Sequence, residues 1–169
     1  MATGIKVFAP ASVANLACGY DILGLALERP GDEIIIRKID GKGLKINKIF
    51  GADRKLPTDI HKNTAGLAAY ALLKSVDRIG EGIEMDIYKK MPSGSGLGSS
   101  AASAAAAVWG INALLDLRLT KRELLHFAVL GEQAADGSYH ADNVAPSLMG
   151  GIIFIRDNES LDIHKLPPI

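Results

Sequence analysis

Apolar and polar positions alternate with period two in several short segments, which predicts β-strands there. The clearest case is Ile83–Tyr88, whose apolar side chains are expected to face inward and whose Glu84, Asp86 and Tyr88 are expected to face outward. Similar patterns predict strands over residues 4–10, 32–39, 44–49 and 152–155. A Gly-Lys-Gly turn at 41–43 separates the second and third of these, so we expect 44–49 to pair with 32–39 as a hairpin.

Apolar residues spaced by three or four positions predict three helices. The first begins after Asn63, a capping residue, and carries its apolar stripe as far as Ile79. The second extends from residue 99 to about residue 115. Thr120 and Glu123 have the spacing of a capping box, which opens the third helix. Its buried stripe is expected to contain Leu124, Leu125, Ala128, Gly131 and Ala135.

This order of elements predicts an α+β fold, in which a mixed sheet packs against helices. We interpret residues 1–169 as one domain that ends in an extended, proline-containing linker at about 157–169. Residues 11–21 fit neither period, so they are interpreted as a buried connection in which Asn15 and Asp21 bond nearby backbone. Residues 140–146 are expected to form a turn-rich loop.

The composition narrows the classes of partner and compartment. Hydrophobic residues make up 48% of the chain and charged residues 22%, as in soluble globular proteins. Nineteen basic residues balance nineteen acidic ones, which argues against nucleic-acid and membrane partners. The single Cys18 fits a reducing compartment, and the weakly polar run at 101–115 is too short to span a bilayer. We therefore expect a cytoplasmic protein.

The sequence MPSGSGLGSS at residues 91–100 predicts an anion-binding loop. Gly94, Gly96 and Gly98 can adopt positive φ and let a ligand approach the backbone. The helix that follows would present unpaired N–H groups and the positive end of its dipole. Together these features indicate a phosphate site. A tight turn chosen only for packing is the alternative, which the full Gly-x-Gly-x-Gly-Ser-Ser pattern makes less attractive.

The better-known phosphate loops do not match this segment. No Gly-Lys-Ser/Thr follows at the spacing of a Walker A loop. Ser99 occupies the place of the third glycine of the dinucleotide fingerprint. The catalytic motifs of protein kinases are absent from the sequence as well. The loop is therefore of another type, one without a lysine.

A metal ion could accompany the phosphates. Mg²⁺ prefers hard oxygen ligands and takes few of them from protein, so one serine at the helix start could be a ligand. Glu132 follows Ala128 by four residues and Leu125 by seven, which places it near the buried face of its helix. A buried carboxylate needs a partner. Periodicity leaves open whether that partner is a metal or a structural polar group.

Three separated segments carry a family resemblance. Residues 92–101, PSGSGLGSSA, resemble the ATP-binding motif of the GHMP small-molecule kinases. Within that superfamily, PASVANL at 10–16 with GYD at 19–21 is similar to the opening motif of the homoserine kinase family. HADNVAP at 140–146 is similar to the substrate-side loop of that family. The resemblance implies the GHMP kinase N-terminal domain, a fold similar to ribosomal protein S5 domain 2.

The resemblance also implies a reaction and its cofactors. ATP, with Mg²⁺, would give its γ-phosphoryl group to the side-chain hydroxyl of L-homoserine, forming O-phospho-L-homoserine on the route to threonine. Asn143 cannot accept a proton, so direct attack by the hydroxyl, aided by positioning and charge stabilisation, is the implied mechanism. A homodimer is compatible with the resemblance.

The site residues implied by the resemblance fall into three groups. Those expected around ATP are Pro92, Ser93, Gly94, Ser95, Gly96, Leu97, Gly98, Ser99, Ser100, Ala101 and Ala102, with Asn63. The expected magnesium ligands are Ser100 and Glu132. The expected homoserine site contains Asn15, Asp21, His140 and Asn143. Of all these, Ser100, Glu132 and Asn143 are the residues expected to act in catalysis.

The chain is little more than half as long as a member of this family. The C-terminal GHMP domain, which supplies arginines to the substrate site, is not contained in it, so we expect the chain alone to be inactive. Two alternatives stay open. One is another GHMP kinase, such as a mevalonate-type enzyme. The other is an inactive module that binds nucleotide, or an RNA-binding relative that the balanced charge disfavours.

Overall fold

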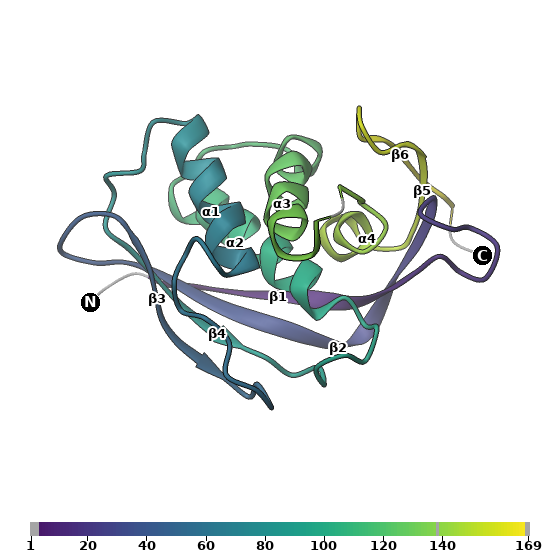
Figure 1. The fold of residues 1–169 in the computed structure, drawn as a ribbon. Helices are drawn as coiled ribbons and strands as arrows, with labels where there is room; N and C mark the ends of the chain where they lie inside the picture. Colours follow the sequence, from purple (N-terminus) through teal and green to yellow (C-terminus); the bar gives the residue numbers. More distant parts are fainter. Residues whose placement is uncertain (1–3, 138, 168–169) are drawn as a thin grey trace.

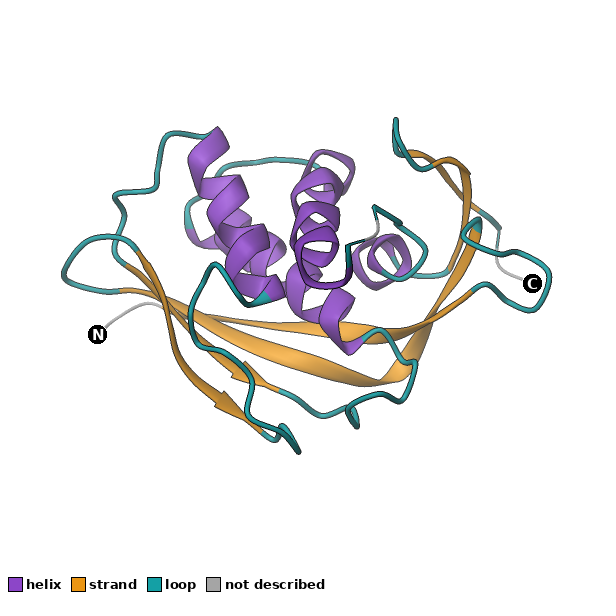
Figure 2. Ribbon diagram, viewed as in Figure 1, coloured by secondary structure: helices purple, strands orange, loops and turns teal. Residues whose placement is uncertain are grey.

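A computed structural model describes residues 4–137 and 139–167, leaving aside the side chains of residues 135 and 136. In this part of the chain the elements, in order, are β1 (Gly4–Ala14), β2 (Leu23–Lys38), β3 (Leu44–Phe50), α1 (Thr64–Ser75), β4 (Ile83–Tyr88), α2 (Ser99–Leu114), α3 (Lys121–Asp136), α4 (Val144–Met149), β5 (Ile152–Asp157) and β6 (Asp162–Lys165). The helices form one layer over one face of a single sheet (Figures 1 and 2). The predicted α+β class is confirmed.

Strand β2 is the centre of the sheet. It pairs antiparallel with β1, with β4 and, near its start, with β5. Beyond these, β3 pairs parallel with β4 and β6 pairs antiparallel with β5. The mixed sheet expected from the sequence therefore has parallel pairing only between β3 and β4 in the part of the chain that the structure describes.

The predicted hairpin between residues 32–39 and 44–49 is wrong. Strand β4 lies between β2 and β3, with Glu33 opposite Tyr88 and Lys38 opposite Ile83. The turn at 41–43 does reverse the chain, but α1 then carries it across to β4, and such a crossover produces the parallel pair. The partner of β3 comes later in the chain, so local turn signals could not identify it.

Strand β4 alternates as predicted, but one side chain on its outer face is buried. Ile83, Met85 and Ile87 are buried against the helices. Asp86, expected outward, is also buried, because Asn47 Nδ2 donates to its Oδ1 at 2.8 Å and Arg37 covers its other oxygen. Polar side chains of the neighbouring strands thus cover this carboxylate on the outer face of the sheet.

Two further expectations about element ends are corrected. Helix α1 ends at Ser75, because Asp77 adopts φ 54°, and Ile79 lies beyond the helix and is exposed. Strand β1 continues to Ala14 after an irregularity between Pro10 and Ser12, so the first part of the 11–21 connection is a strand. Its small residues hide the period from sequence analysis.

The segment after residue 140 is more regular than expected. Helix α4 begins at Val144 inside the predicted loop, and it tolerates Pro146 because first-turn N–H groups need no partner within a helix. Residues 162–165, expected in a linker, form β6 against β5. In α3 the capping box is confirmed, and Leu124, Leu125 and Ala128 are buried as predicted. The side chain of Ala135, also predicted there, lies outside the described set.

Helix α2 packs closely on the centre of the sheet. A Cβ added at Gly110 would lie 2.5 Å from Ile36 Cδ1, and the run of alanines before it is almost wholly buried. Small residues therefore bring the start of this helix, and the glycine loop in front of it, down onto β1 and β2. Within the described residues, every helix is too short or too polar to cross a membrane.

Candidate functional site

The glycine loop joins β4 to α2 and exposes its backbone at two positions. Gly94, Gly96 and Gly98 have φ of 71°, 72° and 64°, a region that residues with a Cβ rarely adopt. A Cβ added at Gly94 or Gly96 would meet nothing within 4 Å. The backbone at these two glycines is therefore open to a ligand.

A cavity of about 410 Å³ lies between this loop and the connection from β3 to α1. Thr64 and Ser99 both line it, so the N-terminal ends of α1 and α2 open into the same space. The lining consists of Ile49, Arg54, Leu56, Pro57, Lys62, Asn63, Thr64, Ile87, Lys89, all residues from 92 to 100, and Ser103. Two helix N-termini at one cavity favour an anion there.

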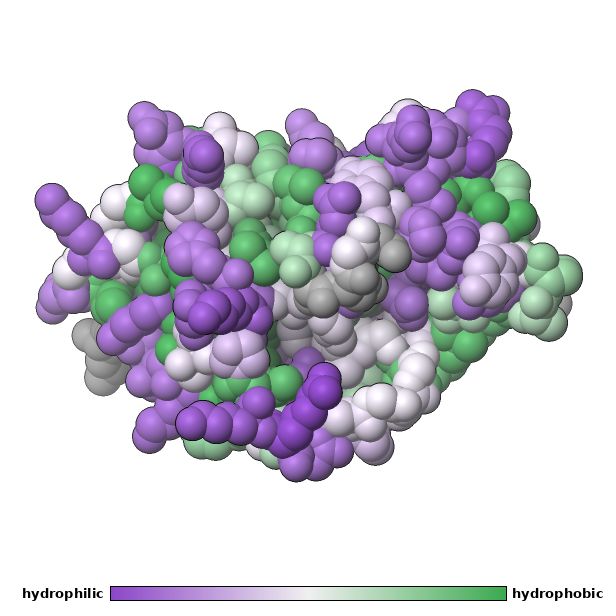
Figure 3. Space-filling view, in the orientation of Figure 1, coloured by the Kyte–Doolittle hydropathy of each residue, from purple (hydrophilic) through white to green (hydrophobic). Residues whose placement is uncertain are grey.

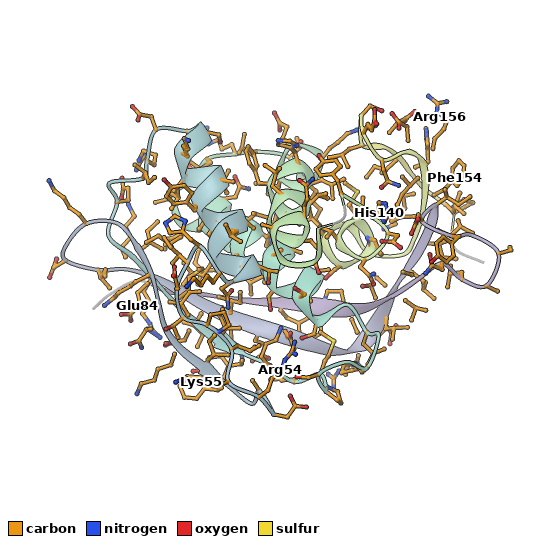
Figure 4. The ribbon with its side chains drawn as sticks, in the orientation of Figure 1. Arg54, Lys55, Glu84, His140, Phe154 and Arg156 are labelled. Atoms are coloured by element: carbon orange, nitrogen blue, oxygen red, sulfur yellow. The ribbon has the colours of Figure 1, made fainter. Side chains whose placement is uncertain are left out.

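The charge of the lining supports the same conclusion. Arg54, Lys62 and Lys89 line the cavity, and none of the described lining residues is a carboxylate. Figure 4 shows Arg54 beside the loop that leads into α2. In the space-filling view, strongly hydrophilic residues (purple) lie next to pale ones along the lower edge of this face (Figure 3). Because Lys89 is paired with Asp32, Arg54 and Lys62 supply the positive charge at this cavity.

Beneath the loop, Lys89 and Asp32 form a buried ion pair that sequence analysis missed. Lys89 Nζ donates to Asp32 Oδ2 at 2.6 Å, to the Ser99 carbonyl at 2.8 Å and to Ser103 Oγ at 2.7 Å. This uses all three donors of the ammonium group. Ser99 Oγ and the Lys90 N–H also donate to Asp32. The pair joins β2 to the first turns of α2, over a sequence separation that no local pattern reveals.

The outer edge of the loop is held by Asp53. Ser93 donates to this carboxylate through both its backbone N–H and its hydroxyl. These hydrogen bonds, the hydroxyl's first, keep the pKa of Asp53 below its usual range. Asp53 adjoins Arg54, so the contact holds the β3–α1 connection against the glycine loop. No local sequence pattern predicts this contact, since 40 residues separate the partners.

A second polar cluster surrounds Asp21, away from the cavity. Asn15 Oδ1 accepts from the Asp21 N–H at 2.8 Å, and His140 Nδ1 lies 3.4 Å from Asp21 Oδ1. Asn158, which sequence analysis did not single out, donates to the Asp21 carbonyl at 3.1 Å and accepts from the Ala141 N–H at 2.9 Å. The structure therefore brings three of the residues expected at the acceptor site together, and His140 lies beside α4 (Figure 4).

Asp142 adds a buried carboxyl group to this region. Its pKa is raised by burial and, to a lesser degree, by the charge of Asp21, while His140 acts in the opposite direction. A cation bound nearby would favour the ionised form of Asp142. Asp142 was inside a segment identified from sequence, yet only its burial in the structure distinguishes it.

Asn143 lies between the cavity and the Asp21 cluster. Its Oδ1 accepts from Ser12 Oγ at 2.8 Å, and a Cβ placed on Gly98 would come within 2.8 Å of the same Oδ1. The carboxamide is therefore in contact with the end of the glycine loop, although Asn143 does not line the cavity itself.

Most of the residues expected around a nucleotide and a metal line the cavity, but three of them do not. Residues 92–100 and Asn63 line the cavity, and Asn63 Oδ1 also caps α1 by accepting from the Ala65 N–H at 3.0 Å. Ala101 and Ala102 are buried inside α2 and do not line it. Glu132 is half-buried on α3 outside the lining, next to Gly131, whose added Cβ would lie 2.6 Å from the Thr64 carbonyl.

Comparison with known proteins gives a family. Residues 63–151 match the model of the GHMP kinases N terminal domain. The chain is 44% identical to a homoserine kinase of Chlorobium phaeovibrioides and 42% identical to one of Methanococcus vannielii, over 97% and 96% of its length. It spans 54% of each of these relatives, about half of their length.

Solved structures agree with this comparison. A crystal structure of homoserine kinase from Cytophaga hutchinsonii is similar with a TM-score of 0.92 and 51% identity, covering 97% of this chain and 52% of that one. Mevalonate kinase from Methanococcus jannaschii is similar in fold, with a TM-score of 0.77 at 16% identity, covering 98% of this chain and 56% of the other.

The buried pair predicts unequal effects for two adjacent lysines. Lys89→Met leaves the Asp32 carboxylate buried without its cation, which should lower the free energy of unfolding by about 3–5 kcal/mol. Lys90→Met removes an exposed pair with Glu33 and should cost less than about 1 kcal/mol. Urea unfolding followed by circular dichroism measures both. Equal losses for the two variants would contradict the account.

The Asp53 contact predicts a change in loop protection. Asp53→Ala should speed hydrogen exchange at the amides of residues 93–96 roughly three- to tenfold, because the loop loses its outer attachment. Because the pKa of Asp53 is lowered in the folded chain, the contact should be fully present at pH values above the usual carboxyl pKa. It should be lost as the pH falls below about 4. Asp40→Ala, an exposed change elsewhere, is the control. Unchanged exchange in Asp53→Ala would refute this role.

Proposed function

Because this chain belongs to the GHMP kinases, as their N-terminal domain, we propose that it binds ATP at the glycine loop and serves the phosphorylation of L-homoserine. The observation that carries the proposal is the open backbone at Gly94 and Gly96, in a cavity where two helix N-termini meet the cationic side chains of Arg54 and Lys62. Identities of 42–44% to homoserine kinases support the choice of acceptor.

The cavity fits the chemistry of a triphosphate. Positive φ at successive glycines turns backbone N–H groups toward one concave surface, which suits phosphate oxygens. Arg54 and Lys62 add cationic side chains at the same cavity, while Lys89 is already neutralised by Asp32. The preorganised donors would stabilise the charge that develops on the phosphates during transfer.

A divalent cation also fits the donor set. Among the described residues there is no group of three His, Cys, Asp or Glu that could hold a metal. Mg²⁺ does not require one, because it usually takes one or two protein oxygens and fills the rest with phosphate and water. Ser100, which lines the cavity, and Glu132 would hold it, and when bound it would neutralise phosphate charge.

The Asp21 cluster suits the acceptor. L-homoserine has an ammonium group, and Asp21 with the neighbouring Asp142 offers carboxyl groups to a cation. Asn15 and His140 hydrogen-bond or contact Asp21 and so fix its position. Asn143, between this cluster and the glycine loop, would contact the hydroxyl that accepts the phosphoryl group.

The Asn143 carboxamide cannot take a proton, and the proposed transfer proceeds by direct attack of the hydroxyl. The homoserine oxygen forms a bond to the γ-phosphorus while the bond from that phosphorus to the bridging oxygen breaks, which releases ADP. The hydroxyl proton leaves to a phosphate oxygen or to water. Such a reaction needs mainly positioning and charge stabilisation, which the loop and the helix ends provide.

We further propose that catalysis requires the rest of the length found in the relatives, since the chain spans about half of them. The matched region would be the ATP-binding domain, and a second GHMP domain would complete the acceptor site. A biosynthetic activity of this kind and the single Cys18 support a cytoplasmic location.

The test is ADP release with L-homoserine and with mevalonate, each in the presence of Mg·ATP. It is run on this chain alone and on the chain fused to the remainder of the Cytophaga hutchinsonii enzyme. We expect homoserine-dependent release from the fusion. In it, Asp21→Asn should raise the KM for homoserine about 10- to 100-fold through loss of a charge-assisted contact.

Asp116→Asn, an exposed change between α2 and α3, is the matched control and should leave the KM unchanged. Calorimetry of the chain with Mg·ATP completes the design. Release that depends on mevalonate but not on homoserine, or no heat of ATP binding to either protein, would overturn the proposed function.

A further inference from the structure

Ser12 is a fully buried hydroxyl at the point where three parts of the site meet. Its backbone N–H donates to the Leu97 carbonyl at 3.0 Å, which attaches the end of the glycine loop to the edge of β1. Its Oγ donates to Asn143 Oδ1 at 2.8 Å, which attaches the same strand to the start of α4. One residue therefore contacts both the expected phosphate loop and the carboxamide expected at the acceptor.

The hydroxyl contact determines which end of the Asn143 amide faces which way. A buried hydroxyl proton needs an acceptor, and among the described residues Asn143 Oδ1 is the acceptor that Ser12 has. With Oδ1 committed to Ser12, the NH₂ group of Asn143 is directed away from β1 and can donate to a ligand. Without the hydroxyl, the two ends of the amide could exchange places.

The fit around Gly98 shows how little room this arrangement leaves. A Cβ on Gly98 would lie 2.2 Å from Ser12 Oγ and 2.8 Å from Asn143 Oδ1. The loop backbone thus packs directly against the hydrogen-bonded pair. A shift of either side chain must move Gly98, and a shift of the loop must move the pair.

We propose that Ser12 is a positioning residue, which orients the Asn143 amide and fixes its distance from the glycine loop so that acceptor and phosphate meet in one geometry. The inference rests on the proposed function and deepens it. Ser12 acts through Asn143 and the loop, and it touches neither reactant. Since misplacement of about 1 Å can cost about 100-fold in rate, loss of the hydroxyl should affect turnover more than binding.

A matched control exists on the same two elements. Ser147 Oγ donates to the Pro10 carbonyl at 2.8 Å, so it also joins α4 to β1 through a buried serine. Its backbone N–H donates to the Asn143 carbonyl at 3.3 Å, but among the described residues its hydroxyl bonds Pro10 and not the Asn143 carboxamide. Ser12→Ala and Ser147→Ala should therefore destabilise the fold to a similar degree, lowering Tm by about 2–5 °C, while only Ser12→Ala disturbs Asn143.

The first measurement uses this chain by itself. The side-chain NH₂ signals of Asn143 are assigned in a ¹⁵N NMR spectrum by their loss in Asn143→Asp. Ser12→Ala should shift these signals and the Gly98 amide, whereas Ser147→Ala should leave the Asn143 NH₂ signals in place. Signals that stay unmoved in a folded Ser12→Ala variant would overturn the link, whether or not the chain belongs to a homoserine kinase.

The second measurement is a double-mutant cycle in the fused enzyme. Ser12→Ala should lower kcat for homoserine about 10- to 100-fold with the KM for ATP changed less than about twofold. In an Asn143→Ala background the same change should alter kcat less than about twofold, because Ser12 acts through Asn143. Wild-type kcat in Ser12→Ala, or independent losses in the double variant, would refute the positioning role. An unmutated fusion without homoserine-dependent ADP release would instead refute the proposed function, and the NMR result would still decide the link.

Discussion

The buried ion pair between Lys89 and Asp32 fixes the N-terminal end of α2, and the candidate site depends on the position of that end. Asp32 is wholly buried and Lys89 nearly so, and three hydrogen bonds from the ammonium join β2, the Ser99 carbonyl and Ser103. A buried charge is tolerated only when it is paired and hydrogen-bonded. The glycine loop therefore begins and ends on rigid elements, β4 and α2, although its own backbone is open to a ligand.

Strand β1 connects the glycine loop to the polar cluster around Asp21. Through Ser12 it holds Leu97 of the loop and Asn143 at the start of α4, and its continuation leads to Asn15 and Asp21. The two polar regions are thus built on one strand and one central sheet. The proposed phosphoryl transfer would need this kind of fixed relation between the two regions.

Local sequence patterns predicted features that depend on neighbouring residues, such as turns and helix caps. They could not predict contacts between residues that are far apart in the chain. Gly94, Gly96 and Gly98 identified the loop because positions with positive φ favour glycine. The capping box likewise identified the start of α3. Asp32 and Lys89 lie 57 residues apart and follow no period, and the partner of β3 comes after an intervening helix. Asp86 faces outward as predicted, but alternation cannot foresee that Arg37 and Asn47 cover and bury it.

The proposed function depends on the cavity at the glycine loop receiving the phosphates of ATP. A crystal structure of this chain with Mg²⁺ and a non-hydrolysable ATP analogue would test this. We expect β- and γ-phosphate oxygens within about 2.7–3.2 Å of backbone N–H groups in residues 94–100. Phosphates bound outside that cavity, with the loop amides free of ligand, would contradict it.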